Sequence, residues 1–335
     1  MHQRPETTVM TSINRIAVLT SGGETPGMNS AIRAVVRTAS KAGVEVMGVH
    51  RGFAGLVQQD FQNLDSLSVS RIIQGGGSIL RCGSCKEFYQ ADIRQLCGEI
   101  LRKHKIEALV VIGGAGSITG AHLLNTETGI PVMAIPGTIE NDIAGCDDAI
   151  GFDTAVNTAV EAIDKLQDTA FSHQRLFLVE VAGTNSGFVA AEVALAIGAE
   201  MLIVPEHLVD VAEVAQQLSQ NLRSGLPANG MVVLAEGSAQ PKLMQKLVDE
   251  LKVRGEDPRI CVLGHIQRGG APTAHDRSLA ASLGNAVIHL LLAGTTNRLV
   301  GIEKSEIKAL PLSEIVDKRK PLSFDAIKLV EELGR

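Results

Sequence analysis

The sequence predicts an α/β fold in two lobes, built on doubly wound and mostly parallel sheets. Short runs rich in β-branched residues alternate with longer segments of helical period, which is the pattern of βαβ units. At 335 residues the chain is also longer than a single hydrophobic core usually supports. Glycine-rich loops follow several of the expected strands, as in open parallel sheets that bind ligands at their carboxyl edge.

The first lobe is expected to begin with a strand at residues 16–20, because this run is apolar and precedes a glycine-rich loop. A helix follows at about residues 28–42. The same order then recurs, with a strand at 108–112, a helix to about 124 and a strand at 132–135. Residues 1–12 have no apolar core and read as a frayed tail rather than a signal peptide.

The second lobe is expected to begin with a helix at about residues 154–169, then a strand at 176–181 and an alanine-rich helix through 197. Later strands and helices alternate: strands at 201–204, 231–235 and 260–263, helices at about 209–222, 241–251 and 276–292. A last strand and helix, near 299–302 and 324–333, return toward the first lobe. The expected division is therefore 13–138 with about 300–335, and 139–299.

Composition excludes several classes of protein. The chain is 45% apolar, yet no run approaches the roughly 20 apolar residues of a membrane helix. Five cysteines at scattered spacings argue against a disulfide framework, and we expect reduced thiols and a cytoplasmic location. A net charge of −6 and very few aromatic residues argue against nucleic-acid binding.

Cys82 and Cys85 have the spacing of a redox pair or of half a zinc site. No second pair of ligands is evident in the sequence. Two unreactive loop thiols are the simpler interpretation.

Two glycine-rich loops are candidates for phosphate binding. The segment from Ser21 to Gly27 joins a strand to a helix, so its backbone amides could hold an anion, or it could be a tight turn without a ligand. It is not a Walker A loop, because Met28 stands where lysine is required. The loop from Gly113 to Gly120 lacks the spacing and the acidic residue of a dinucleotide-binding fingerprint, so an oxidoreductase is disfavoured.

Two carboxylates, Glu140 and Asp142, lie two residues apart after an expected strand. In an extended segment both would point to one face, where they could deprotonate a hydroxyl and hold a cation beside a phosphate. The alternative is a pair of solvated turn carboxylates.

Cationic side chains lie in the expected second lobe. Arg175, Arg259 and Arg268 are suited to bidentate binding of a phosphomonoester, and Arg268 lies in the glycine-flanked loop 264–270 with His265. His173 could contribute or could be a structural residue. Together with the acidic pair, these groups indicate a site for two phosphorylated ligands.

The order of these motifs resembles that of the bacterial ATP-type phosphofructokinases, from about residue 13 to residue 320. The motifs are VLTSGG at 18–23, PGTIEND at 136–142, SHQR at 172–175 and the loop at 264–270. The resemblance implies a two-lobed phosphofructokinase-like fold, typically a homotetramer, that transfers the γ-phosphoryl of Mg-ATP to the 1-hydroxyl of fructose 6-phosphate in glycolysis. The first lobe would then carry the nucleotide and the second the sugar phosphate.

Carried over by position, the resemblance assigns a role to each motif. Catalysis falls to Glu140 as base, Asp142 as the ligand of Mg²⁺, and Thr138. The nucleotide would contact Gly23, Gly116, Ser117, Gly120, Ser84 and Cys85. The sugar phosphate would contact Thr138, Gly183, Thr184, Glu236, His265 and Arg268, with Arg175 and Arg259 from a neighbouring subunit. Arg33, Arg37 and Glu200 would belong to an effector site.

Several positions depart from the family pattern. Ala115 replaces an aspartate that helps to hold magnesium, Ser84 and Cys85 replace an arginine and an aromatic residue, and Thr184 replaces an arginine of the sugar-phosphate site. Glu140 and Glu24 replace aspartates, and Asp60 stands where an effector-site arginine is expected. Gly116 and Gly137 are of the ATP type, so a change of donor to pyrophosphate is not supported.

Two hypotheses remain. In the first, the chain is a catalyst, a phosphofructokinase-type kinase with Glu140 as its base, which uses either the family's usual donor and sugar phosphate or a different pair. In the second, it is a catalytically silent paralogue that binds a sugar phosphate as a regulatory or assembly subunit, in a hetero-oligomer with a competent homologue.

Overall fold

The computed structural model describes residues 13–173, 175–224, 230–238 and 242–334. The expected tail at residues 1–12 lies outside this range. The chain divides into two compact units: unit 1 comprises residues up to 138, 143–151 and 270–320, and unit 2 comprises 139–142, 152–269 and 321–335. Each unit is an α/β layer structure with its own sheet.

Unit 1 contains a seven-stranded sheet in the order β11-β10-β5-β4-β1-β2-β3. The strands are β1 (Arg15–Ser21), β2 (Glu45–Val49), β3 (Phe61–Leu64), β4 (Ala108–Gly113), β5 (Val132–Pro136), β10 (Arg298–Glu303) and β11 (Glu306–Pro311). The strands from β2 to β10 in this order pair in parallel, and only the edge strands β3 and β11 pair antiparallel. The central strand β4 is buried along its whole length, as expected for a parallel sheet covered on both faces.

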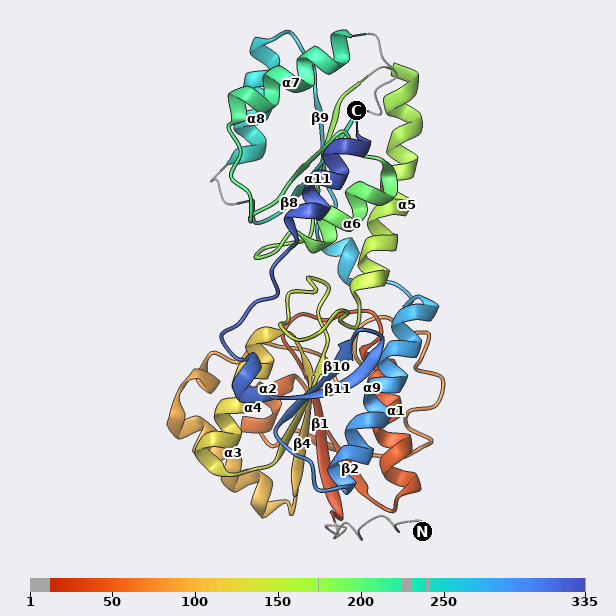
Figure 1. Cartoon of the computed structure of the whole chain (residues 1–335). Helices are drawn as coiled ribbons and strands as arrows, with labels where there is room; N and C mark the ends of the chain where they lie inside the picture. The colour runs from red at the N-terminus through yellow and green to blue at the C-terminus, as the bar shows by residue number, and fades with distance from the viewer. Residues whose placement is uncertain (1–12, 174, 225–229, 239–241, 335) are drawn as a thin grey trace, which may run out of the picture. The chain divides into compact units, whose positions relative to one another are not determined.

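Helices cover both faces of this sheet. Apolar side chains of α1 (Met28–Lys41) and α9 (Ala274–Leu292) pack on one face with Val18 and Val110, and the two helices lie side by side in Figure 1. The other face is covered by the remaining helices. They are α2 (Gly52–Val57), α3 (Ala91–Lys103), α4 (Ala115–Thr128), the short α10 (Leu312–Ile315) and the 3-10 turn η1 (Glu87–Tyr89).

Unit 2 contains a four-stranded parallel sheet in the order β7-β8-β6-β9. Its strands are β6 (Phe177–Val181), β7 (Met201–Ile203), β8 (Met231–Ala235) and β9 (Arg259–Val262). One face is covered by α5 (Phe152–His173), α6 (Phe188–Ile197) and α11 (Phe324–Leu333), and the other by α7 (Val211–Arg223) and α8 (Leu243–Val253). A 3-10 helix, η2 (Gly264–Arg268), follows β9.

The boundaries of the units differ from the expected lobes at residues 143–151, which were expected in the second lobe but belong to unit 1, and at two helices. Residues 270–299 were expected in the second lobe, but α9 packs on α1 in unit 1 because Leu279, Leu283 and Val287 complete that core. Conversely, α11 was expected to return to the first lobe, but Ile327 and Val330 pack in the core of unit 2. Residue 241, the expected start of the helix at about 241–251, lies outside the described residues.

In the described part of the chain, no helix combines the length and the apolar character that a membrane crossing requires.

Candidate active site

The loop after β1 leads directly into the first turn of α1. Its last residue, Gly27, has a left-handed backbone with φ 103°, and a Cβ there would lie 2.7 Å from Cγ2 of Ile150. Glycine is therefore required by geometry at this position. No side chain caps the helix, but the backbone nitrogens of Met28 and Ser30 donate to the carbonyls of Thr25 and Gly27 at 3.4 Å and 2.9 Å. What this end of the helix offers to an anion is therefore mainly the positive end of its dipole.

The carboxyl ends of β4 and β1 pack tightly against each other. A Cβ on Gly113, the last residue of β4, would lie 2.5 Å from the backbone oxygen of Ser21, the last residue of β1, so the two strand ends approach as closely as their backbones allow. Helix α4 begins at Ala115 without a side-chain cap and without an acidic residue in its first turn. Ala115 and Gly116 are exposed, and no atom lies within 4 Å of a Cβ built on Gly116. A second helix N-terminus with open space above it therefore lies at this edge of unit 1.

Gly120 has a structural explanation of its own. A Cβ there would lie 3.2 Å from the ring of Phe53 and 3.3 Å from that of Phe88, two rings that stack with centroids 4.0 Å apart. Its predicted contact with a nucleotide stays a prediction. Thr138 follows β5 and lies near Gly114, where a Cβ would be 3.6 Å from that of Thr138.

A third segment, residues 78–86, lies at the same edge. Thr20 Oγ1 donates a hydrogen bond to the carbonyl of Arg81 at 2.9 Å and is 2.7 Å from Oγ of Ser78. Ser84 is exposed, and Cys85 is half-buried. Burial, the largest cause, raises the pKa of the thiols of Cys82 and Cys85, so neither is activated as a thiolate. Within the described residues, no group of three or more His, Cys, Asp or Glu side chains could hold a metal ion.

In unit 2, Glu140 reaches the loop that follows β6. Its carboxylate accepts a hydrogen bond from the backbone nitrogen of Asn185 at 3.4 Å, and Ser186 Oγ donates to its backbone carbonyl at 3.0 Å. Burial and then the neighbouring carboxylate of Asp142 raise the pKa of Glu140, while the amides of Asn185 and Thr184 and the charge of Arg268 oppose this shift. A carboxylate with a raised pKa beside a second acid is typical of general bases, although buried ion networks show the same shift.

Gln267, which the sequence gave no reason to select, joins two parts of this half-site. It is completely buried, accepts a hydrogen bond from the backbone nitrogen of Ala182 at 3.1 Å, and donates to the carbonyl of Gly264 at 3.0 Å. These bonds hold η2, which carries His265 and Arg268, against the loop that carries Thr184. The sequence offered no signal for Gln267 beyond its position between the candidate ligands His265 and Arg268.

The predicted sugar-phosphate residues of unit 2 lie on three of its loops. Gly183 has φ 145°, and a Cβ there would lie 2.4 Å from the carbonyl oxygen of Ser186, so the turn requires glycine. Glu236 follows β8 and donates from its backbone nitrogen to the carbonyl of Val181 at 2.9 Å, beside that loop. Thr184, Glu236 and His265 are exposed, and Arg268 is half-buried.

Arg175 and Arg259 lie at the opposite, amino ends of their strands. Arg259 begins β9, is exposed, and pairs with Asp257 at 2.9 Å, while Arg175 precedes β6 and is also exposed. Within unit 2, neither residue belongs to the group formed by Glu140, Thr184 and Arg268. His173 ends α5 and is exposed, so it is not a buried structural histidine.

The predicted effector residues are distributed over both units. Arg33 and Arg37 lie on α1 in unit 1. Glu200 in unit 2 is 7% exposed and accepts a hydrogen bond from the backbone nitrogen of Gly230 at 2.6 Å. Asp60 forms an ion pair with Arg51 at 2.9 Å, which explains structurally why an acid is accommodated there. An effector role for Arg33, Arg37 and Glu200 stays a prediction.

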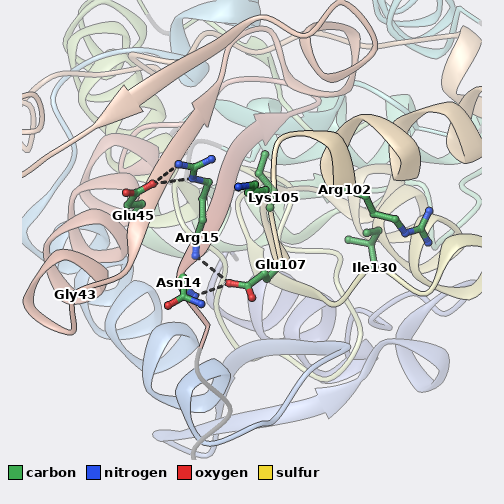
Figure 2. Close-up of a pocket in the computed structure, with 9 residues that line it drawn as sticks. Asn14, Arg15, Gly43, Glu45, Arg102, Lys105, Glu107 and Ile130 are labelled. Atoms are coloured by element: carbon green, nitrogen blue, oxygen red, sulfur yellow. Dashed lines mark hydrogen bonds and ion pairs between the residues drawn. The ribbon is translucent and has the colours of Figure 1, made fainter.

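A pocket of about 800 Å³ lies at the other end of the unit 1 sheet, where β1 and β2 begin. Figure 2 shows Arg15 directed to Glu45, and the backbone nitrogens of Asn14 and Arg15 directed to Glu107. Arg15 also donates to the carbonyl of His104 at 2.9 Å. Because these charged groups are largely paired with one another, the pocket is a poor candidate for an active site.

A comparison with protein-family models matches residues 15–291 to the model described as phosphofructokinase. The ATP-dependent 6-phosphofructokinase of Thermotoga neapolitana is 46% identical over 310 residues, which cover 92% of this chain and 96% of that protein. The chain belongs to the phosphofructokinase family. ATP-dependent 6-phosphofructokinase 1 of Thermus thermophilus, a further phosphofructokinase, is 46% identical over 325 residues, which cover 96% of this chain and all of that protein.

Solved phosphofructokinases share the fold. The T-state enzyme of Pichia pastoris matches with a TM-score of 0.85 and 29% identity over 99% of this chain, which spans 38% of the Pichia chain. The pyrophosphate-dependent phosphofructokinase of Marinobacter aquaeolei matches with a TM-score of 0.80 at 23% identity, covering 93% of this chain and 86% of that one. At this low identity, the match to the Marinobacter protein shows a shared fold and nothing about activity. The expected fold class is confirmed, with mostly parallel sheets in both units.

Proposed function

We propose that this chain is an ATP-dependent 6-phosphofructokinase, which transfers the γ-phosphoryl of ATP to the 1-hydroxyl of fructose 6-phosphate in glycolysis, in the cytoplasm. The observation that carries the proposal is the half-buried Glu140 carboxylate, held beside Asp142 and the loop after β6. Relatives 42–46% identical over nearly the whole chain carry this name.

In the proposed reaction Glu140 accepts the proton of the sugar hydroxyl. The hydroxyl oxygen forms a bond to the γ-phosphorus as the bond between that phosphorus and the β–γ bridging oxygen breaks, and ADP leaves. The amides of Thr184 and Asn185 orient the carboxylate. Because burial raises the pKa of Glu140, its basicity is better matched to a hydroxyl proton than that of a solvated glutamate.

The 6-phosphate is proposed to bind His265 and Arg268 on η2, beside Gly183 and Glu236. The role of Thr138 in binding the sugar phosphate stays a prediction. Thr184 is uncharged, so more of the binding energy falls to the remaining cations. Arg175 and Arg259 are exposed at the far ends of their strands, which supports their use by a neighbouring subunit of a homotetramer.

Magnesium is proposed to arrive with the nucleotide. Mg²⁺ commonly takes one or two carboxylates together with substrate phosphates, and Asp142 with the nearby Glu140 fits that donor set. The cation would supply charge neutralisation at the phosphates. The uncapped N-termini of α1 and α4 would hold phosphate oxygens, with Gly23, Gly116 and Ser117 giving close approach.

A coupled assay of the purified chain with fructose 6-phosphate and ATP, ADP, GTP or pyrophosphate tests the proposal. We expect turnover with Mg-ATP and at most weak turnover with pyrophosphate. Turnover with another donor alone would overturn the assignment of ATP. Clear calorimetric binding of fructose 6-phosphate without turnover with any donor would instead identify the silent regulatory paralogue.

A further inference from the structure

Arg81 is exposed on the segment that follows the glycine run at residues 75–77. Its backbone is left-handed, with φ 59°, a conformation that is unfavourable for an L-residue other than glycine, asparagine or aspartate. A residue keeps such a conformation only where the surrounding structure imposes it.

Hydrogen bonds fix the backbone of Arg81 at the carboxyl end of β1. Its nitrogen donates to the carbonyl of Ser78 at 3.0 Å, and its carbonyl accepts from Thr20 Oγ1 at 2.9 Å. The preceding residue, Leu80, is completely buried and accepts from the backbone nitrogen of Arg51 at 2.8 Å. The position of the Arg81 backbone is therefore determined by the core of unit 1.

This position is one strand away from the N-terminus of α4. Thr20 is aligned with Ile112 in the parallel β1–β4 pair, and Ser21 with Gly113, which immediately precedes the first turn of that helix. Arg81 thus rises from the same edge of the sheet as the two uncapped helix N-termini.

Other cations of these loops are less suited to a phosphate. Arg51 donates from Nη2 to Gln58 at 2.7 Å and to Asp60 at 2.9 Å. Lys86 is exposed and its charge acts on neighbouring Glu87. The guanidinium of Arg81 forms no hydrogen bond or ion pair with the described residues, so five donors are available to a ligand.

We propose that Arg81 is a catalytic residue that binds the γ-phosphoryl of the nucleotide and neutralises its charge during transfer. The inference rests on the proposed kinase function. Phosphoryl transfer depends on charge neutralisation more than on covalent chemistry. Arg81 would supply the positive charge that neither Ser84 nor Cys85 can provide.

The decisive variant is Arg81→Gly, because glycine relieves the left-handed backbone and removal of the side chain should not impair folding. We expect kcat with Mg-ATP to fall about a hundredfold or more. Calorimetry should show ATP binding weakened about tenfold or more, with ADP binding nearly unchanged, because only ATP carries the γ-phosphoryl. Arg81→Lys should recover part of kcat, since the charge remains while the fork of donors is lost.

Lys86→Ala is the matched control from the same segment and should leave kcat and both affinities near wild type. Ser84→Arg in the Arg81→Gly background should restore part of the rate. Wild-type kcat in Arg81→Gly, or equal loss of ATP and ADP affinity, would overturn the role of Arg81. A wild-type chain without turnover would overturn the kinase proposal instead, while the ratio of ATP to ADP affinity would still test Arg81.

Discussion

The carboxylate of Glu140 accepts a hydrogen bond from the backbone nitrogen of Asn185, 3.4 Å away, in the loop where Thr184 replaces a family arginine. The two departures from the family pattern, Glu140 and Thr184, are thus adjacent. The Glu140 side chain, one methylene longer than aspartate, reaches the backbone of the loop in which Thr184 replaces an arginine. This contact links the candidate base to the candidate sugar-phosphate site.

Replacing Glu140 with glutamine should abolish proton transfer while keeping the side chain's shape. We expect kcat to fall about 10²–10⁴-fold, with little change in KM for fructose 6-phosphate. Steady-state kinetics with Mg-ATP measure both constants. Glu213→Gln, an exposed change on α7, is the control and should behave as wild type.

The shorter acid Glu140→Asp keeps a carboxylate but withdraws it from Asn185. Its kcat should lie well above that of Glu140→Gln, with a loss of about a hundredfold at most for a shift of about 1 Å. Equal activity of the aspartate and glutamine variants would contradict a base at this position.

Gln267→Ala should weaken the joint between η2 and the loop after β6. The buried amide of Ala182 and carbonyl of Gly264 would lose their partner, at a cost of about 1–3 kcal/mol in the free energy of unfolding. KM for fructose 6-phosphate should rise more than kcat falls, because His265 and Arg268 lose their support. Urea unfolding and kinetics test this against the exposed change Gln245→Ala, and an unchanged KM would argue against a positioning role.

Ala115→Asp should place a carboxylate in the first turn of α4, which has none. The added acid should lower the Mg²⁺ concentration at half-maximal rate, and it should stabilise the helix by about 0.3–1 kcal/mol. Titration of Mg²⁺ at fixed ATP measures the first effect. Ala115→Asn, which lacks the charge, should leave the Mg²⁺ requirement unchanged, and an equal response of both variants would refute the role of charge.

Glu200 should make stability fall with rising pH. Burial raises its pKa above the ordinary value of 4.5, so between that pH and the folded-state pKa the folded protein holds more protons than the unfolded chain. The free energy of unfolding contributed by this group is therefore largest below pH 4.5 and declines as pH rises through the folded-state pKa.

The neutral variant Glu200→Gln should remove this decline. Thermal unfolding should find it at least as stable as wild type at pH 8 and no more stable at pH 4, while Glu213→Gln should show no such crossing. Parallel curves for wild type and Glu200→Gln would show that Glu200 has no raised pKa in the folded protein.

The sequence predicted most of the buried parallel strands, because apolar runs such as those of β1, β4 and β6 carry a strong local signal. The parallel strand β2 was missed, because its short run is interrupted by glycine. The edge strands β3 and β11 were not predicted. Each has polar or exposed residues along most of its length, so it depends on its neighbour for its conformation. Helix α3 was also missed, although its apolar positions Ile93, Cys97 and Ile100 have helical spacing.

In the candidate site, the acidic pair and the glycine loops could be found from residue type and position. Gln267 could not, because its importance lies in bonds to Ala182, 85 positions away in the chain, and an amide side chain gives no periodic or compositional signal. Arg81 was missed for a related reason, since its left-handed backbone and its bond with Thr20 exist only in the folded unit.

The chain passes from one compact unit to the other after residues 138, 142, 151, 269 and 320. Strand β10, which pairs with β5, and helix α9, which completes the core around α1, are both made late in synthesis. Most of the polypeptide must therefore be synthesised before the sheet of unit 1 can be completed. Premature termination after α8 would leave the buried faces of β5 and α1 without their cover, which makes such truncated products natural targets for chaperones and proteases.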